Sequence, residues 1–428
     1  MVTELSGRLN WVGLGEEMIG SKPVRVSVLR DRYPTSFSSP RHSRHDIRRR
    51  LFVPFNKLRA KLDGFTLMQP FDGSDLVHVV NRIPFGARRM ICSFESHIPR
   101  QFGLPSDAIL TKMMLKEITS NRCRRLVGMS HFAMRTALAM HEGTPAYDVI
   151  KAKMMVQHPN VELGQKGDRL KGDDASSLVL TFVGGHFVRK GGCVAVRIAE
   201  KALEQGLPIH VNVISSLQAG ESVWSDPTDP DFLKPYTDLL SLPNVTHFAG
   251  LPNAEAREIM GKSHFTLLPT FEDTFGFSAI ESMAEYTPVI ATNVCALPEV
   301  IYPGRNGHLL HLERDEMGEW VRPDKSERHT EAYTQIYRDT IEMLADEAVE
   351  YLKTVIGKPD ILAAMRADAR YTAEEMFSAD VAGKRWDNLY ERVSRESTQT
   401  PAVCDPVLDR SSPESPAYLF EGKPAGTR

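Results

Sequence analysis

The sequence predicts an α/β protein with two parallel β-sheets, because short apolar runs alternate with helical patterns along most of its 428 residues. In the first half, five runs have the composition of buried strands: Val24–Leu29, Asp75–Val80, Met90–Phe94, Leu126–Met129 and Met154–Val156. Residues 164–177 are polar, contain three glycines and have no apolar period, which indicates a linker. A second set of strand-like runs follows: Leu178–Val183, Ile209–Ile214, Val245–Phe248, His264–Leu268 and Val289–Ala291. Each set is expected to form its own sheet.

The last part of the chain is predicted to be helical. Residues 326–357 carry apolar side chains at helix-like spacings, and two more helices are expected at Asp360–Met376 and Asp380–Val393. The tail, residues 394–428, has scattered prolines and serines and little periodicity, so we expect it to be mostly disordered.

Composition and charge argue against several classes of protein. The formal net charge of −3 gives no general attraction to nucleic acid. The five cysteines lack Cys-x-x-Cys spacing, which indicates a reducing compartment and argues against a structural zinc site. The first residues lack the pattern of a signal peptide, and no stretch approaches the ~20 apolar residues of a membrane span. We therefore expect a cytoplasmic protein, and association with the inner face of a membrane stays open.

The most informative segment is residues 264–288. A strand-like run leads into Pro269 and Thr270, and then come two acids, an aromatic–Gly–aromatic turn and a helix that holds Glu281. The N-terminus of such a helix has unsatisfied N–H groups and a positive dipole end, which bind anions and above all phosphates. Asp273 lies just before this end and roughly 12 Å from Glu281 along the axis, at ~1.5 Å per residue. This arrangement suits a nucleoside-diphosphate sugar.

The segment resembles the donor-site signature of the family 4 retaining glycosyltransferases (glycosyl transferases group 1), which have the GT-B fold. The family pattern is Glu-x(7)-Glu around a Phe-Gly pair, followed by Glu-Ala/Ser-Met-Ala and Pro-Val-Ile-Ala. The matching residues are Phe275, Gly276, Glu281, Ser282, Met283, Ala284, Pro288, Val289, Ile290 and Ala291. The first acid in register is Asp273 rather than Glu, with Glu272 one residue before it. Pro298–Ile301 and Asn306–Leu310 continue the family pattern.

The resemblance implies two Rossmann-like domains that face each other across a cleft. Residues 1–163 would form the acceptor-side domain, 164–177 the linker and 178–376 the nucleotide-sugar donor domain. Residues 377–393 would form a helix that crosses back to the N-terminal domain, and 394–428 the tail. The packing residues of this crossing helix would be Phe377, Trp386, Leu389 and Tyr390.

In the donor domain the resemblance gives each part of the signature a role. Asp273 would bind the hydroxyls of the transferred sugar, and Glu281 would hold the ribose. Three consecutive residues would present backbone N–H groups to the sugar and the phosphate: Thr274, Phe275 and Gly276. Glu272 lies beside this register, and the backbone at Gly250 and Leu251 would border the nucleotide base.

A second motif combines a Gly184-Gly185 turn with Arg189 and Lys190 at the start of a helix. Glycines let the backbone approach a ligand closely, and basic side chains beside a helix start neutralise a diphosphate. The resemblance assigns Lys190 to the family lysine that holds the leaving diphosphate. Gly185 stands where the family usually has an arginine. Arg189 is the candidate to replace it, and a solvated Arg-Lys pair is the alternative.

On the acceptor side, Ser93–His97 follows a buried strand. The family often has a histidine in this loop, close to the transferred sugar; Glu95 falls at that position, and His97 lies two residues on. A carboxylate or an imidazole could stabilise an oxocarbenium-like transition state or bind a sugar hydroxyl, and a polar loop rim is the alternative. Ser130-His131-Phe132 resembles a family turn that lines the interdomain cleft.

The stretch Arg41–Lys61 is densely basic. It fits contact with anionic lipid headgroups or with a lipid-diphosphate acceptor, and equally a solvated flexible loop. A nucleic-acid patch would need interleaved aromatic residues or a recognised fold, and neither is evident.

The resemblance implies a metal-independent, retaining transferase that moves a sugar from a nucleotide sugar to a glycan, lipid-linked or small-molecule acceptor in polysaccharide biosynthesis. The nucleotide sugar is a substrate, and no cofactor or metal is expected. Asp229 and Asp231 have Asp-x-Asp spacing, but neighbouring prolines indicate a plain loop. Two alternatives stay open: a phosphate-dependent sugar phosphorylase on the same fold, and a catalytically weak sugar-nucleotide-binding or scaffold protein.

Overall fold

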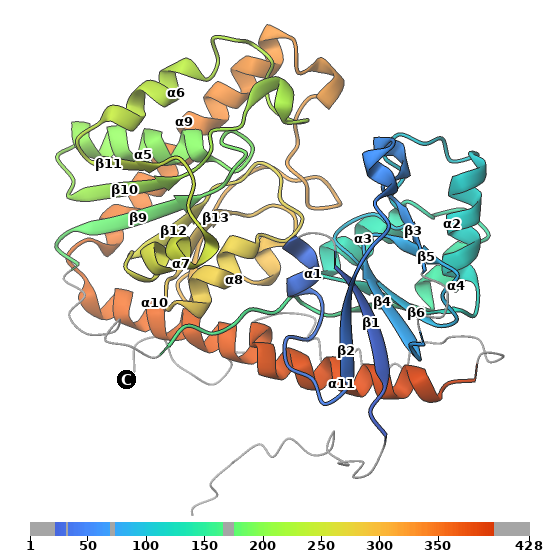
Figure 1. Ribbon diagram of the computed structural model, residues 1–428. Helices are drawn as coiled ribbons and strands as arrows, with labels where there is room; N and C mark the ends of the chain where they lie inside the picture. The colour runs from blue at the N-terminus through green and yellow to red at the C-terminus, as the bar shows by residue number, and fades with distance from the viewer. Residues whose placement is uncertain (1–21, 31–32, 69–72, 166–174, 398–428) are drawn as a thin grey trace, which may run out of the picture.

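A computed structural model describes residues 22–30, 33–68, 73–165 and 175–397, which form two six-stranded parallel sheets (Figure 1). We call the part with the first sheet the N-terminal domain and the part with the second sheet the C-terminal domain. The first sheet has the order β2-β1-β4-β6-β7-β8. Its strands are β1 (Arg25–Arg30), β2 (Asp46–Leu51), β4 (Leu76–Val80), β6 (Met90–Phe94), β7 (Cys123–Gly128) and β8 (Met154–Val156).

The second sheet has the order β11-β10-β9-β12-β13-β14. Its strands are β9 (Leu178–Val183), β10 (Ile209–Ile214), β11 (Val245–Phe248), β12 (Phe265–Leu268), β13 (Val289–Thr292) and β14 (Gly307–Leu310). All residues of β12 and β13 are buried, as expected for strands of a parallel sheet that is covered on both faces. The sheet lies between α5 (Gly192–Glu204), α6 (Lys234–Asp238), α7 (Asn253–Gly261), α8 (Phe277–Ala284), α9 (Glu331–Val355) and α10 (Pro359–Thr372).

The N-terminal domain has shorter helices and one excursion from its sheet. The helices are α1 (Tyr33–Phe37), α2 (Ile109–Thr119), α3 (His131–Ala139) and α4 (Tyr147–Lys151). After β2 the chain forms two 3₁₀ turns, Phe55–Lys57 and Ala60–Leu62, and then β3 (Phe65–Leu67), which pairs with β5 (Ile83–Phe85). This excursion lies at the end of the domain that is far from α11 (Figure 1).

The last helix, α11 (Ala379–Arg395), packs on the sheet of the N-terminal domain (Figure 1). Trp386, Leu389 and Tyr390 share a buried cluster with residues of β1 and β4, and the Tyr390 hydroxyl lies 2.7 Å from Nδ1 of His78. Phe377 differs from the expectation, because it precedes α11 and belongs to a buried cluster that contains residues of both domains. It lies in a π-helical turn (Ala373–Phe377) that separates α10 from α11.

The structure corrects several sequence-based expectations. Four strands were not predicted: β2, β3, β5 and β14. Residues Asp46–Leu51 of the basic stretch form the edge strand β2 rather than a flexible loop, because they pair with β1 in register. The predicted disorder from residue 394 is wrong for Ser394 and Arg395, which belong to α11. Most of the expected linker (166–174) and of the tail (398–428) lies outside the described residues.

The two domains are in direct contact. Both carboxylate oxygens of Glu299 accept hydrogen bonds from the first turn of α3, from the N–H of His131 at 2.8 Å and of Phe132 at 2.6 Å. The rings of Phe37 and Phe277 lie 4.6 Å apart across the same boundary. No helix among the described residues is long and apolar enough to cross a membrane.

Candidate functional site

The candidate site lies at the carboxyl ends of β9 and β12, which are neighbours in the sheet. The loop after β9 holds Arg189 and Lys190, and the loop after β12 holds Glu272 and Asp273. The Phe271 N–H donates to the Arg189 carbonyl at 2.9 Å, which joins the two loops. The strand order therefore brings together two motifs that lie about eighty positions apart in the sequence.

At the centre of the site, the Lys190 ammonium and the Asp273 carboxylate form an ion pair. Burial raises the pKa of Asp273, but the charges of Lys190 and Arg189 outweigh burial, so this pKa lies below its ordinary value. Burial lowers the pKa of Lys190, and Asp273 opposes that change. The pair therefore places a positive and a negative charge side by side in a mostly buried position.

Helix α8 begins directly above this pair. Gly276 precedes the helix with φ of 83°, and a side chain there would also collide with Leu297 and Leu268. No side chain caps the start of α8 among the described residues. An uncapped helix start is a place where an anion can bind, although the Phe275 N–H in the preceding loop already bonds to the Asp273 carboxylate.

The second acid of the signature, Glu281, is buried inside α8. Its Oε1 accepts a hydrogen bond of 2.8 Å from Nδ2 of Asn253, the first residue of α7. Gly250 and Leu251, which precede α7, thus lie on the segment that leads into the Glu281 contact. Glu281 and the loop after β11 meet, as a site for ribose and base would require.

Parts of the chain are similar to known proteins. Residues 177–322 match the family model "Glycosyl transferases group 1". D-inositol 3-phosphate glycosyltransferase of Mycolicibacterium vanbaalenii is 27% identical over 210 residues (46% of this chain, 44% of the relative), and that of Mycobacterium bovis is 28% identical over 205 residues (46% and 39%). The chain thus spans less than half the length of these curated relatives.

Solved structures share the fold across both domains. A glycosyltransferase from Rickettsia africae has a TM-score of 0.50 at 18% identity and covers 76% of this chain and 78% of its own. Anabaena Alr3699/HepE, solved with UDP-glucose, has a TM-score of 0.50 at 13% identity and covers 86% and 100%. Residues 177–322 are thus similar to the group 1 glycosyltransferases, and the chain has the GT-B fold. Identities this low show the fold alone.

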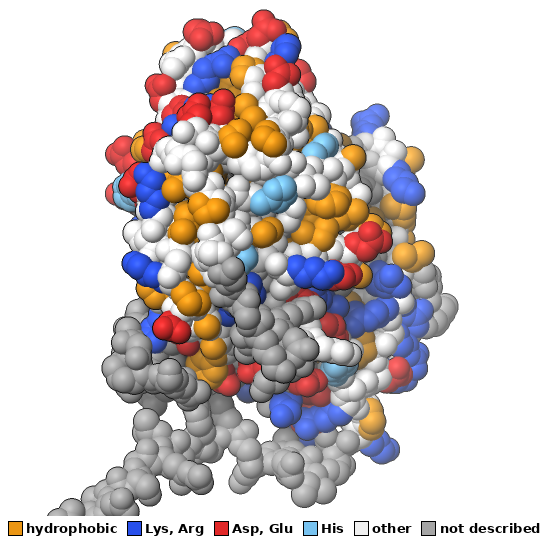
Figure 2. Space-filling view, turned by 90° about the vertical axis from the view of Figure 1, so that its left-hand side faces the viewer, with side chains coloured by type: hydrophobic (Ala, Val, Ile, Leu, Met, Phe, Trp, Pro, Cys, Tyr) orange, Lys and Arg blue, Asp and Glu red, His pale blue; other side chains and the backbone are white. Residues whose placement is uncertain are grey.

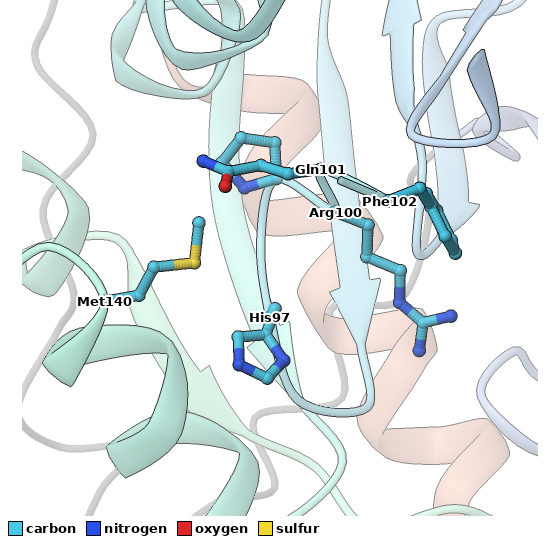
Figure 3. A pocket seen from close by; sticks show the side chains of 6 residues that line it. His97, Arg100, Gln101, Phe102 and Met140 are labelled. Atoms are coloured by element: carbon cyan, nitrogen blue, oxygen red, sulfur yellow. The ribbon is translucent and has the colours of Figure 1, made fainter. Parts of the chain in front are cut away.

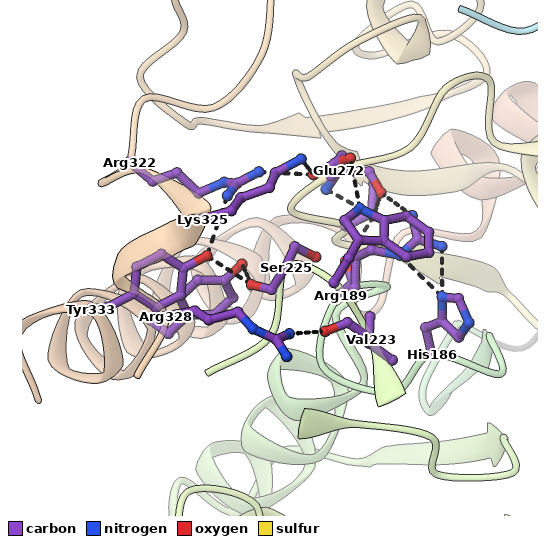
Figure 4. Close-up of polar contacts among 12 residues, drawn as sticks. His186, Arg189, Val223, Ser225, Glu272, Arg322, Lys325, Arg328 and Tyr333 are labelled. Carbon is purple, nitrogen blue, oxygen red and sulfur yellow. Dashed lines mark hydrogen bonds and ion pairs between the residues drawn. The ribbon is translucent and has the colours of Figure 1, made fainter. Parts of the chain in front are cut away.

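In the C-terminal domain, Glu272 lies in a polar network with residues of other loops (Figure 4). One carboxylate oxygen accepts from Nε1 of Trp224 at 3.2 Å, and the other binds Arg322 and Lys325, each at 2.8 Å. Burial raises the pKa of Glu272, but Lys325 and Arg322 more than offset burial and hold it below its ordinary value. Glu272 therefore acts as an anchor for two other loops.

Sequence reasoning missed the three partners of Glu272. Trp224 comes from the loop after β10, and Arg322 and Lys325 come from the segment between β14 and α9. A tryptophan in a polar stretch after the predicted strand Ile209–Ile214 is a sequence signal that could have been used for Trp224. The structure shows its side chain to be half-exposed. The two cations lie in no pattern that the sequence alone reveals.

The Arg189 side chain contacts the residues around the Lys190–Asp273 ion pair. Its Nη1 donates to the Glu272 carbonyl at 2.6 Å, its Nε lies 3.2 Å from Nδ1 of His186, and its guanidinium stacks over Trp224 (Figure 4). Gly185 is exposed, and a Cβ there would meet only Ser216 Oγ, at 3.6 Å. Gly184 follows β9, and its N–H donates to the Ile214 carbonyl at 3.0 Å.

In the N-terminal domain, Glu95 and His97 have different surroundings. The Glu95 carboxylate pairs with Arg100 and accepts from Nδ2 of Asn81 at 2.9 Å, so it is engaged within its own domain. His97 lines a pocket of about 330 Å³ with Pro99, Arg100, Gln101, Phe102 and Met140 (Figure 3). Partial burial, Arg100 and Lys325 of the other domain lower the pKa of His97, so the pocket lies close to the Glu272 network.

The turn Ser130-His131-Phe132 lies at the interdomain contact. The Ser130 hydroxyl accepts from the Ala133 N–H at 2.9 Å and caps α3. The N–H groups of His131 and Phe132 donate to Glu299. This turn is thus occupied by a residue of the other domain.

The described residues hold no group of three or more His, Cys, Asp or Glu side chains placed to bind a metal ion. Asp229 pairs with Arg338 at 3.1 Å, and Asp231 is exposed. Asp226 is fully buried, and burial raises its pKa to about 7.

Proposed function

We propose that this protein moves a sugar from a nucleotide-sugar donor to an acceptor and keeps the configuration at the anomeric carbon. The observation that carries the proposal is the meeting of Lys190, Asp273 and the uncapped start of α8 at one edge of the sheet. A cation and a helix N-terminus together neutralise a diphosphate, and the adjacent carboxylate can accept hydrogen bonds from sugar hydroxyls.

The roles follow from these positions. Lys190 and the N–H groups of Thr274, Phe275 and Gly276 hold the diphosphate, and Asp273 orients the sugar. Glu281 accepts from the ribose hydroxyls, with Asn253 fixing its orientation. The backbone at Gly250 and Leu251 borders the base.

The reaction needs no protein nucleophile. The acceptor oxygen bonds to the anomeric carbon on the face that the diphosphate leaves, and the bond from that carbon to the diphosphate oxygen breaks. The acceptor proton passes to the departing diphosphate. Lys190 stabilises the charge that develops on the leaving group, which favours a metal-independent reaction.

The acceptor side is the pocket beside His97. This imidazole is open to a sugar hydroxyl, whereas Glu95 is committed to Asn81 and Arg100 and acts through the position of Arg100. A glycan, a lipid-linked sugar or a small molecule fits this assignment. The reaction would take place in the cytoplasm as a step of polysaccharide biosynthesis.

Two observations bear on the alternatives. The contact between Glu281 and Asn253 beside the loop after β11 favours a nucleotide over free phosphate as the leaving group, which argues against a phosphorylase. Gly185 stands where the family usually has an arginine for the diphosphate. For this reason a catalytically weak sugar-nucleotide-binding protein stays an alternative.

The test is a thermal-shift series with UDP, ADP and GDP, their glucose derivatives and free glucose. A ligand that binds only the native state raises its melting temperature. We expect a nucleoside diphosphate to stabilise the protein more than the free sugar does, and equal, negligible shifts would refute the donor site. Release of sugar from the preferred donor without acceptor would separate an enzyme from a scaffold.

A further inference from the structure

The end of the N-terminal domain that holds the 3₁₀ turns exposes an unusual number of apolar side chains. We call residues 51–67 and 98–119 together the tip. Six of its large hydrophobic side chains are exposed: Leu51, Leu58, Leu67, Phe102, Ile109 and Met113. Leu51, Leu58 and Ile109 are more than three-quarters exposed. Single exposed apolar residues are ordinary, but six on adjoining segments indicate a surface that is covered in use.

The segments of the tip are in direct contact. A side chain at Gly64 would overlap the carbonyl oxygen of Arg100 and approach the sulfur of Met114 on α2. The Ile83 N–H donates to the Gly64 carbonyl at 3.0 Å, which ties the excursion to β5. Figure 1 shows the 3₁₀ turns and α2 at the same end of the domain.

The same segments also carry exposed cations. They are Lys57, Arg59, Lys61, Lys112 and Lys116. Of the acids in the tip, Asp63 is buried against Arg82 and Glu117 pairs with Arg122, so Asp107 is the exposed carboxylate of the described tip. On the side of the C-terminal domain, by contrast, acidic and basic side chains are interspersed (Figure 2).

Three arginines of residues 41–50, which precede the tip, have partners within the protein. Arg44 pairs with Glu391, Arg48 with Asp46, and Arg49 donates to Ser39 and to the Pro40 carbonyl. These contacts lie within the protein and hold β2 and α11 in place. Within Arg41–Lys61, the exposed cations that lie in the tip are Lys57, Arg59 and Lys61.

We propose that the tip docks on a lipid bilayer that contains anionic lipids. Leucine side chains that enter the interface, surrounded by Lys and Arg at the headgroup level, give the combination of apolar burial and electrostatic attraction that interfacial binding requires. Phe102 belongs both to the tip and to the pocket with His97. The docked bilayer therefore adjoins the acceptor pocket, and, on the basis of the proposed function, the acceptor is a lipid-linked molecule presented from the membrane.

The experiment is flotation of the full chain with vesicles of phosphatidylcholine alone and with added phosphatidylglycerol. We expect binding to the anionic vesicles that weakens as salt rises. At about 1 kcal/mol per cation, the triple variant Lys57→Ser, Arg59→Ser, Lys61→Ser should lose about a hundredfold in partitioning. The double variant Leu51→Ser, Leu58→Ser should lose about tenfold or more at unchanged charge.

Matched controls come from the C-terminal domain. Lys234→Ser, Lys262→Ser, Lys353→Ser removes three exposed lysines, and Leu203→Ser, Ile361→Ser removes two exposed apolar side chains. Both controls should bind vesicles like the wild type, and circular dichroism checks that every variant is folded. Equal loss in control and tip variants would overturn the proposal, as would a wild type that ignores anionic vesicles. Self-association that the leucine variant abolishes, without vesicle binding, would assign the tip to a second copy of the chain instead.

Stabilisation by UDP is measured on the same samples, because the donor loops lie in the other domain. Vesicle binding without any nucleotide response would refute the donor site and leave the docking surface. A nucleotide response without vesicle binding would do the reverse.

Discussion

The Lys190 ammonium and the Asp273 carboxylate form an ion pair although the two residues lie 83 positions apart in the chain. Because the pair is mostly buried, each charge depends on the other for its solvation. A diphosphate that enters the site would compete with Asp273 for Lys190. Binding of the donor would therefore release the Asp273 carboxylate to accept hydrogen bonds from the sugar.

We expect the pair to behave as a unit in stability measurements. Lys190→Gln should destabilise the fold by about 3 kcal/mol, because it leaves Asp273 buried without its counter-charge. Asp273→Asn leaves the opposite charge unpaired, whereas the double variant buries neither charge and should cost less than the sum of the two. Urea denaturation measures all three variants. Lys262→Gln is the control, since its pair with Glu258 is exposed and should contribute below about 1 kcal/mol. Additive costs in the double variant would contradict the coupling.

The buried carboxyl group of Asp226 should make the stability of the fold depend on pH. Burial raises the pKa of Asp226 from 3.8 to about 7, so the folded protein keeps a proton that the unfolded chain releases near pH 4. The free energy of unfolding should therefore fall as pH rises from about 4 to about 7, by up to about 1.4 kcal/mol per pH unit, and then level off. Asp226→Asn carries no charge and should be more stable than the wild type at pH 8 but similar to it below about pH 4, where the carboxyl is largely protonated in the folded and unfolded wild type alike. Asp229→Asn, which removes a pair with Arg338, serves as the comparison. Parallel pH profiles for wild type and Asp226→Asn would show that the buried carboxyl does not control the trend.

The local part of the site could be predicted because its residues are contiguous. Asp273, Gly276 and Glu281 are set by one strand–loop–helix unit, and the periodicity of that unit is visible in the sequence. The environment of Glu272 could not be predicted, because its partners come from two distant loops whose approach depends on the packing of the whole domain.

The edge strand β2 shows another limit of sequence reasoning. Its sequence, Asp-Ile-Arg-Arg-Arg-Leu, lacks the alternation of a half-buried strand, and its ends are exposed. It forms because β1 offers a complete row of backbone partners and because Arg49 is held by Ser39 and Pro40. Charge density alone therefore suggested a free basic patch where the structure has internal contacts.

Chelation should leave the transfer rate nearly unchanged. The proposed leaving group is neutralised by Lys190 and the start of α8, and Asp229 in the loop after β10 is paired with Arg338. Turnover is measured with the preferred donor before and after EDTA. Loss of activity that Mg²⁺ or Mn²⁺ restores would revive Asp229 and Asp231 as metal ligands.

The buried acid of α8 should control donor affinity. Glu281→Gln keeps the size of the side chain but gives up the charged acceptor for ribose hydroxyls, so nucleoside-diphosphate affinity should fall roughly ten- to a hundredfold, from ~1.5–3 kcal/mol per charged hydrogen bond. Asn253→Ala removes the 2.8 Å contact that orients Glu281 and should cost less. Calorimetric titration with the nucleoside diphosphate measures both variants. An unchanged affinity in Glu281→Gln would place the ribose elsewhere.

The two neighbouring acids should differ in kinetics. Asp273 lies against Lys190, where the sugar and the diphosphate would meet, so Asp273→Asn should lower kcat by about tenfold or more while donor affinity changes less. Glu272 faces Trp224, Arg322 and Lys325, and Glu272→Gln keeps an oxygen for the indole N–H. Its effect on kcat should therefore stay below about tenfold, and should come with a looser segment around Arg322 that proteolysis can detect. Steady-state kinetics on both folded variants decides between them. A damaging Glu272→Gln beside a silent Asp273→Asn would show that the sugar contacts the first acid of the pair, and that the network around Glu272 opens when the donor binds.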